Sequence, residues 1–172
     1  MNETIKSIIG RRSIRRYKPE QIKKSELDAI LTAGTFAPTA MNRQSPLIVA
    51  VTDPDTVRLL SQMNAAVLGG DSDPFYGAPA VVVVFADSTI GPHVEDGALV
   101  MGNMMNAAYS LGVGSCWIHR AKEMFEGERG LELKRKWGVP DNFVGIGNCI
   151  LGYPAPPTPE ARPRKGGYII RV

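Results

Sequence analysis

The chain has 172 residues, of which 44% are apolar and 22% are charged. That balance is typical of one globular domain, and it excludes an intrinsically disordered chain. Lys and Arg number 20 against 17 Asp and Glu, so the net charge is only +3. A charge this small excludes binding of nucleic acid or membranes through the whole surface, and any electrostatic recognition must be local.

Three helices are predicted in the N-terminal half, where apolar residues recur at helical spacing: Thr4–Gly10, Ser25–Thr35 and Asp53–Met63. Their expected N-caps are Thr4, Ser25 (followed by Asp28 as in a capping box) and Asp53 (followed by Pro54). Apolar, β-prone runs predict strands over Pro46–Val51 and Val81–Phe85.

The longest predicted helix, His93–Leu111, is apolar on nearly all sides. A helix of this kind must be covered either by the domain core or by a partner chain. Gly112 is expected to end it. A strand over Val113–Ile118, a charged helix over roughly Glu126–Trp137 and a strand over Phe143–Gly152 complete the expected order.

From Ala155 the chain is rich in proline, and it closes with the β-prone segment Tyr168–Val172. We expect one domain, 1–172, in which 155–172 form an extended arm long enough to reach the sheet of a second subunit. Because helices precede the first strand and the last strand is detached, the expected class is α+β.

Targeting and redox signals are weak. The longest apolar run, Ala80–Ala86, is far shorter than the roughly 20 residues of a membrane-spanning helix, and no secretory signal is visible at the N-terminus. Cys116 and Cys149 lie in apolar segments, where reduced and buried thiols are expected. Two histidines are too few for a metal site of their own. We therefore expect a cytoplasmic protein with no metal and no membrane partner.

Several common catalytic motifs are missing: the P-loop, H-E-x-x-H, G-x-S-x-G and paired C-x-x-C. Gly112-Val113-Gly114 leaves a helix and opens a strand, which is the reverse of a dinucleotide-binding loop. Cys116 and His119 are three residues apart, so on one strand they point to opposite faces and do not form a nucleophile–base pair.

Arginines gather in Arg11–Tyr17, directly after the first predicted helix. If the chain is extended there, Arg11, Ser13 and Arg15 share one side and the intervening residues share the other. Two guanidinium groups and a hydroxyl suit a phosphorylated small molecule. A solvated basic turn is the alternative.

Two further polar segments stand out. The loop 37–44 places Asn42 and Gln44 between a helix and a strand, where their amides could read the edge of a heterocycle, or could merely satisfy the local backbone. Arg162-Pro163-Arg164-Lys165 is a second cationic segment, which is either a clamp for an anion or a solvated tail.

Taken in order, these segments resemble the nitroreductase family of FMN-dependent oxidoreductases. The resemblance runs from R-R-S-I-R-R-Y (11–17) and A-P-T-A-M-N-R-Q (37–44) along a helix that carries Asp96 and Asn103 into L-G-V-G-S-C-W-I (111–118). It ends with I-L-G-Y-P (150–154) and P-R-K (163–165), and so covers nearly the whole chain.

The resemblance implies a three-layer α+β fold with a mixed sheet flanked by helices. It implies an intertwined homodimer that exchanges C-terminal strands and binds FMN at the subunit interface. NAD(P)H would reduce flavin N5, and a small oxidised acceptor such as a nitroaromatic or quinone would then take the electrons in a ping-pong cycle. No side chain is expected to act as a catalytic acid or base, because the cofactor carries the chemistry.

Site residues follow from the resemblance position by position. Those matching the motif around the phosphate, ribityl chain and ring edge are Arg11, Arg12, Ser13 and Arg15. Those matching the loop contributed by the partner subunit are Pro38, Thr39, Ala40 and Asn42. Those matching the strand along the ring are Ser115, Cys116, Trp117 and Ile118, and Arg162 or Arg164 matches the C-terminal phosphate cation. We assign Arg15 to the ring edge, where a cation stabilises the negative charge of the reduced flavin.

The chain also departs from the family. Pro38-Thr39-Ala40 stands where P-S-S is commoner, and Ser45-Pro46-Leu47 stands where many members have Pro-Trp. Residues 64–79 and 121–140 are short where larger members build lids, so the pocket is either more open or closed by Phe75, Tyr76 or the arm. A non-catalytic flavin-binding or flavin-scavenging protein remains the main alternative, and a nucleic-acid-binding protein that uses the arginines is another.

Overall fold

The computed structural model describes all 172 residues, and its centre is a four-stranded sheet. The strands are β1 (Leu47–Val51), β2 (Ala80–Asp87), β3 (Gly114–Ile118) and β4 (Phe143–Gly152), in the order β1-β2-β4-β3. Every neighbouring pair of these four strands is antiparallel, and the one parallel pairing at the sheet is the isolated bridge between Ser13 and Ser115. Strand β2 begins beside the end of β1, because Val51 pairs with Val81.

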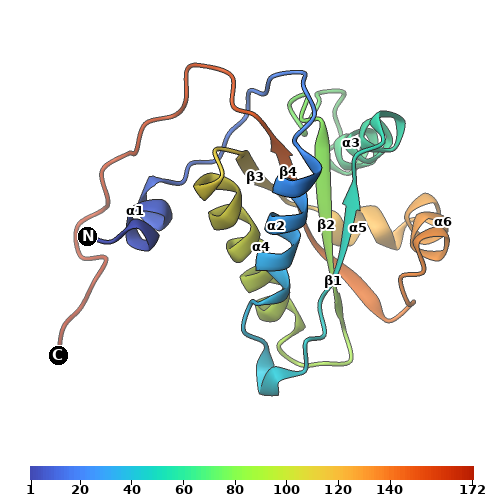
Figure 1. The fold of residues 1–172 in the computed structure, drawn as a ribbon. Helices are drawn as coiled ribbons and strands as arrows, with labels where there is room; N and C mark the ends of the chain where they lie inside the picture. The colour runs from blue at the N-terminus through green and yellow to red at the C-terminus, as the bar shows by residue number, and fades with distance from the viewer.

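Helices cover both faces of this sheet, which confirms the three layers (Figure 1). One face packs on α2 (Lys24–Thr35) and α4 (His93–Ser110), and the other packs on α3 (Pro54–Leu68), α5 (Ala121–Glu126) and α6 (Glu128–Trp137). Alternate residues of β2 enter the two cores, Val82 and Val84 in the first and Val81 and Val83 in the second. Because both faces are covered, β2 reads as a continuous apolar run.

Two expected N-caps are wrong. Helix α1 covers Glu3–Gly10, and its cap is Asn2, whose Oδ1 accepts from the Ile5 N–H at 3.0 Å. At α2 the Glu26 carboxylate accepts from the Lys23 N–H at 3.1 Å, so the chain turns into the helix two residues before Ser25. Asp53 does cap α3, with its carboxylate 2.9 Å from the Thr56 N–H. Several residues can cap near each helix start, and the direction of the incoming chain selects among them.

The charged segment also differs from the expectation of one helix. It forms α5 and α6, which are separated at Gly127. A Cβ on Gly130 would lie 2.1 Å from the Met124 carbonyl oxygen, so the glycine allows α6 to pack closely against α5. Helix α3 continues to Leu68, five residues beyond the predicted Met63, and ends at Gly69 with a left-handed φ of 78°.

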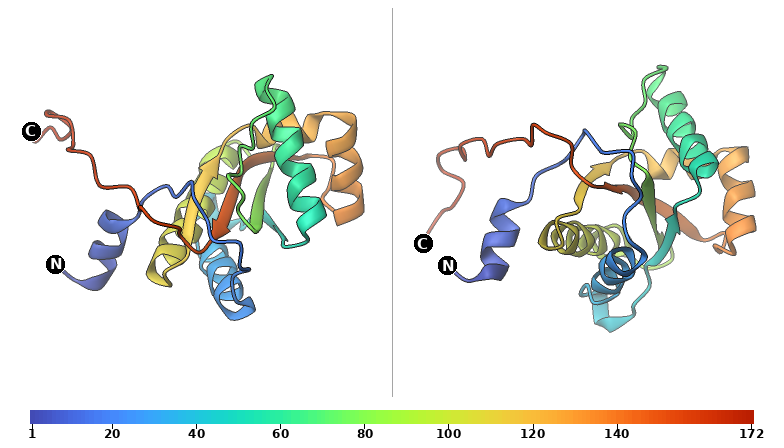
Figure 2. Two further views of the ribbon diagram at one scale, coloured as in Figure 1. Left: turned by 90° about the horizontal axis from the view of Figure 1, so that it is seen from above. Right: turned by 45° about the horizontal axis from the view of Figure 1, so that its top comes forward.

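Helix α1 and the C-terminal arm extend from one side of the body (Figures 1 and 2). The arm leaves β4 beside the N-terminal segment, where the Ala155 N–H donates to the Arg16 carbonyl oxygen at 3.0 Å. Beyond that point the arm is exposed, and Tyr168–Val172 forms no strand in the single chain. None of the helices has the length and apolar character that crossing a membrane requires.

Candidate functional site

The arginine-rich segment is held against the edge of the sheet. Ser13 forms a parallel bridge with Ser115 of β3, and the Ile14 N–H donates to the Ser115 carbonyl oxygen at 3.0 Å. Ile14 is buried and packs against Gly114. A Cβ added to Gly114 would lie only 3.0 Å from the Ile14 side chain. The segment therefore extends the sheet by one short strand-like stretch and places its arginines at a defined register.

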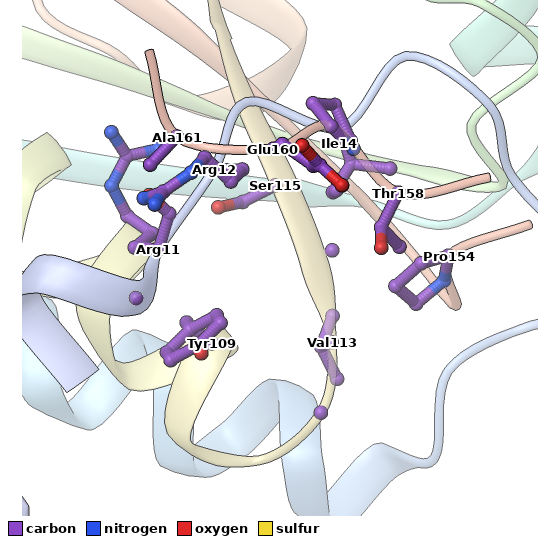
Figure 3. Close-up of a pocket in the computed structure, with 14 residues that line it drawn as sticks. Arg11, Arg12, Ile14, Tyr109, Val113, Ser115, Pro154, Thr158, Glu160 and Ala161 are labelled. Carbon is purple, nitrogen blue, oxygen red and sulfur yellow. The ribbon is translucent and has the colours of Figure 1, made fainter. Parts of the chain in front are cut away.

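A cavity of about 340 Å³ lies between this segment, the C-terminal end of α4 and the start of β3 (Figure 3). Arg11, Arg12 and Ser115 line it on one side, and Tyr109 of α4 forms its floor. Ile14, residues 112–114, Pro154 and, from the arm, residues 158–161 form most of the remaining wall. Sequence reasoning missed Tyr109 and the arm residues, because neither belongs to a recognisable motif.

Three polar atoms around the cavity are buried without a hydrogen-bond partner: Arg11 Nη1, Arg12 Nε and Ser115 Oγ. Buried polar groups nearly always have a hydrogen-bond partner, so three unpaired atoms around one cavity indicate that a ligand supplies the missing partners. Guanidinium N–H groups can only donate, and a hydroxyl can donate as well. The cavity therefore suits a ligand that brings several acceptor oxygens, such as a phosphate group.

The predicted alternation along the arginine segment is wrong at Arg12, which lines the same cavity as Arg11. The Arg12 Nη1 group donates to the carbonyl oxygens of Ile9 and Arg11, at 2.7 Å in each case. These are carbonyls at the end of α1, which have no partner inside the helix and which a cation stabilises. These two hydrogen bonds orient the Arg12 side chain toward the cavity.

Arg15 lies beyond the cavity, on the exposed part of the segment. At about 3.3 Å per extended residue, its Cα lies roughly 13 Å from that of Arg11. Its guanidinium is 6.0 Å from the centre of the Tyr76 ring. Two cationic positions thus stand at opposite ends of one extended segment, which suits an elongated ligand with two polar ends.

The loop residues Pro38, Thr39, Ala40 and Asn42 are far from these arginines within one chain. The Ala40 N–H donates to Asp96 Oδ1 at 3.0 Å in the first turn of α4, whereas Tyr109 stands in the last turn. The 18 residues of α4 span about 27 Å, so the loop and the cavity lie at opposite ends of the helix. A single chain does not bring the two predicted groups together.

This loop is locally strained. Met41, Asn42 and Gln44 all have a φ of 52°, in the left-handed region that side chains other than glycine rarely occupy. The loop is held by the contact of Ala40 with Asp96 and by a 3.0 Å hydrogen bond from the Gln44 N–H to Thr39 Oγ1. Strained, mostly exposed positions of this kind concentrate at binding sites.

The four predicted residues of β3 divide between the two faces of the sheet. Ser115 lines the cavity, whereas Cys116 and Ile118 are buried in the opposite core. Trp117 packs over Gly147, where a Cβ would lie 2.7 Å from the indole. Cys116 and Ile118 therefore present only backbone atoms toward the cavity side, because successive strand residues alternate between faces.

Neither cysteine is a reactive group in this structure. Cys116 and Cys149 are free and buried, and burial raises the pKa of the Cys149 thiol to about 12. Burial also raises the pKa of the Tyr17 phenol, which donates to the Ile14 carbonyl oxygen at 2.7 Å. The Cys149 thiol and the Tyr17 phenol stay protonated near neutral pH and supply no base to the cavity.

The remaining predicted positions lie on the arm and on the loop before β2. Arg162 and Arg164 are exposed, and neither lines the cavity, although the four residues before Arg162 do. Phe75 is buried in the core, so the expectation that it could close the pocket is wrong. Tyr76 is 43% exposed and contacts Arg15.

Comparison with known proteins matches residues 8–153 to the nitroreductase family. The fold is similar to the crystal structure of a nitroreductase with bound FMN from Bacteroides fragilis, with a TM-score of 0.92 and 30% identity over all of both chains. A protein from Archaeoglobus fulgidus, provisionally named NADH dehydrogenase/NAD(P)H nitroreductase, is 34% identical over 90% of this chain and 87% of its own. An FMN reductase (NADPH) from Bacillus subtilis is 27% identical over 90% of this chain and 67% of its own length.

The fold and the donor-lined cavity thus define an α+β oxidoreductase scaffold. The chain belongs to the nitroreductase family, since the family match covers most of its length and the relative from Archaeoglobus fulgidus extends over nearly all of it.

Proposed function

We propose that this protein is an FMN-dependent NAD(P)H oxidoreductase. The observation that carries the proposal is the convergence of Arg11 Nη1, Arg12 Nε and Ser115 Oγ, all buried and unpaired, on one cavity of a nitroreductase-family chain. Bound FMN would supply the redox chemistry, accepting electrons from NAD(P)H and passing them in a separate half-reaction to a small oxidised acceptor such as a nitroaromatic or quinone.

The residues of the cavity hold the cofactor in this proposal. Arg11, Arg12 and Ser115 donate to the phosphate, whose charge makes each of these hydrogen bonds a strong one. Ser13 lies at the bridge between the segment and β3 and would face the ribityl chain, and Arg15 would stand at the ring edge. The backbone of residues 115–118, including Cys116, Trp117 and Ile118, would lie along the ring. Arg162 or Arg164 adds a second cation to the phosphate.

The proposed site is completed by a second copy of the chain. The loop with Pro38, Thr39, Ala40 and Asn42 contacts α4 at Asp96, about 20 Å along the helix from Tyr109 at the cavity of its own chain, so in this proposal the partner supplies it. Exposed apolar side chains mark the surface that the partner would cover, among them Ile8 and Ile9 of α1 and Leu99 of α4. We propose a homodimer of single-domain subunits, 1–172, located in the cytoplasm, where its two free thiols stay reduced.

In this proposal dimerisation also moves the arm away from the cavity of its own chain. In the single chain Glu160 lines the cavity and brings a carboxylate close to the site of a phosphate. In the proposed dimer, 155–172 reach the partner instead, Tyr168–Val172 adds a strand to its sheet, and Glu160 leaves the cavity. Removing this carboxylate lowers the electrostatic cost of binding an anion.

The visible spectrum, gel-filtration size and NAD(P)H consumption of the purified protein test the proposal. We expect a yellow dimer that binds FMN stoichiometrically and oxidises NADH or NADPH only when a quinone or nitroaromatic is present. A yellow protein that consumes neither nucleotide would be a flavin carrier rather than an enzyme. A colourless protein that does not take up added FMN would refute the cofactor assignment itself.

A further inference from the structure

A rigid turn precedes β2. The Asp73 carboxylate accepts from the Phe75 N–H at 2.9 Å, from the Gly77 N–H at 2.6 Å and from the hydroxyl of Ser61 on α3. The Phe75 side chain is buried in the core and anchors the turn. The residue between these anchors, Tyr76, therefore has its backbone position imposed by its neighbours.

Tyr76 has a φ of 54°, a left-handed conformation that is unfavourable for an aromatic residue. Arg120 has a similar φ of 73°, but its guanidinium is fixed by two hydrogen bonds to Asn64 Oδ1, at 2.8 and 3.1 Å. The Tyr76 side chain is 43% exposed and its hydroxyl makes no hydrogen bond in the chain. The turn around Asp73 therefore imposes the backbone conformation of Tyr76 and leaves its ring outside the core.

The contact that Tyr76 does make is with Arg15. The guanidinium carbon lies 6.0 Å from the centre of the Tyr76 ring, within the range of a cation–π interaction. Arg15 forms no salt bridge and donates no side-chain hydrogen bond within the chain. The ring is thus the group that restricts where this exposed guanidinium can lie.

We propose that Tyr76 is a positioning residue that holds the Arg15 guanidinium at the ring edge of the bound flavin. This inference rests on the proposed function, because Arg15 matters for electron transfer only if FMN is bound. Without the aromatic face, the long Arg15 side chain samples other rotamers, and its charge stabilises the anionic edge of the cofactor less often. Tyr76 thereby acts on the rate of electron acceptance through Arg15 and does not itself touch the reacting atoms.

A cofactor-free measurement tests the contact itself. The side-chain protons of Arg15 are expected to show a ring-current shift in the NMR spectrum of the apoprotein. Tyr76→Leu should abolish that shift, and Tyr76→Phe, which keeps the ring, should retain it. An Arg15 spectrum that is the same in wild type and Tyr76→Leu would overturn the proposal, whether or not the protein binds FMN.

Stopped-flow reduction of the FMN-loaded protein by NADH tests the consequence. Tyr76→Leu should slow flavin reduction by about two- to fivefold, as loss of an exposed cation–π contact implies, with a smaller change in the FMN Kd. Tyr76→Phe should restore the wild-type rate. In an Arg15→Ala background, Tyr76→Leu should have no further effect, because no guanidinium remains to be positioned.

The outcomes separate this inference from the proposed function. A protein that binds FMN and turns over, but whose reduction rate is unaffected by Tyr76→Leu, would overturn only the role of Tyr76. Equal slowing by Tyr76→Leu with and without Arg15 would show that the ring acts by another route, which also contradicts the proposal. A wild type that binds no FMN would overturn the proposed function and this role together.

Discussion

The two arginine positions differ in what surrounds them. Arg11 has a buried, unpaired N–H group beside the cavity, whereas Arg15 is exposed and contacts only the Tyr76 ring. A buried donor that gains an anionic acceptor contributes mainly to binding, because its desolvation is already complete in the folded chain. An exposed cation at a ring edge contributes mainly where negative charge develops.

Arg11→Ala should therefore lose FMN affinity. Removing one charge-assisted hydrogen bond of about 1.5–3 kcal/mol corresponds to a rise in Kd of roughly ten- to a hundredfold. Fluorescence titration of apoprotein with FMN measures it, and riboflavin, which lacks the phosphate, is the matched control ligand. If Arg11→Ala weakens riboflavin and FMN equally, Arg11 does not contact the phosphate.

Arg15→Ala should retain FMN but accept electrons slowly. In the proposed site the variant loses the cation at the ring edge and none of the donors at the cavity, so the rate of flavin reduction should fall more than the affinity does. Rapid-mixing absorbance at saturating NADH measures that rate, and Arg15→Lys keeps the charge as a partial rescue. An unchanged rate with flavin bound would refute the role assigned to Arg15.

Acidic side chains should make the fold sensitive to low pH. Hydrogen bonds lower the pKa values of Glu26, Asp53 and Asp87 in the folded state, chiefly bonds from the Tyr153, Thr56 and Thr89 hydroxyls respectively. Carboxylates with lowered pKa values stabilise the fold above about pH 4, and this contribution disappears as the pH falls through the lowered values. Urea unfolding between pH 7 and 2 should show the loss, and Asp87→Asn should reduce its size. A free energy of unfolding independent of pH in this range would contradict the assignment.

At the scale of elements, α4 is the member whose position matters most. Its first turn binds the strained loop through Asp96, and its last turn carries Tyr109 into the cavity. Asn103 in its middle donates to the Ala33 carbonyl oxygen of α2 at 3.1 Å. The packing of this helix on the sheet therefore sets the geometry of both parts of the proposed site.

Gly97→Ala tests that packing. A Cβ on Gly97 would lie 2.6 Å from Ile146 Cγ1 of β4, so the substitution should destabilise the fold by about 1–3 kcal/mol through overpacking. Chemical denaturation measures the free energy of unfolding. In an Ile146→Ala background the same substitution should cost less, because the clashing Cγ atoms are gone. Identical costs in both backgrounds would show that α4 does not approach β4 at this point.

At the scale of the whole molecule, the proposed site belongs to two chains. The arginines and β3 stand at one end of α4 and the strained loop stands at the other, so in the proposed dimer the second subunit supplies the loop. The exposed apolar residues of α1, α4 and the arm give such a dimer a surface to bury. Dimerisation and cofactor binding should therefore be thermodynamically linked.

Complementation between two defective variants tests the shared site. Arg11→Ala damages the cavity side and Asn42→Ala the loop side, so a mixed dimer contains one site with both defects and one intact site. Co-expression with two different tags isolates this dimer, which should recover about half of the wild-type turnover. Recovery no greater than that of either single variant would indicate that each site is built within one chain.

Much of the organisation was predictable from local physical chemistry. Three features depend only on residues close together in the chain: the continuous apolar run of β2, the start of α3 at Pro54 and the end of α4 before Gly112. The arginine segment was likewise found from its spacing and its resemblance to the family. The choice of Asn2 over Thr4 as a cap, or the split at Gly127, depends on chain direction and packing, which nearest-neighbour patterns do not contain.

By itself, the sequence determined the α+β class and the nitroreductase-family membership and predicted the arginine segment as a binding site, because these depend on residue type and order along the chain. Only the tertiary structure decided that the strands are all antiparallel, that Arg12 turns into the cavity beside Arg11, and that Phe75 is buried while Tyr76 meets Arg15. These outcomes follow from contacts between residues distant in the chain, and such contacts are specified by the packing of whole elements.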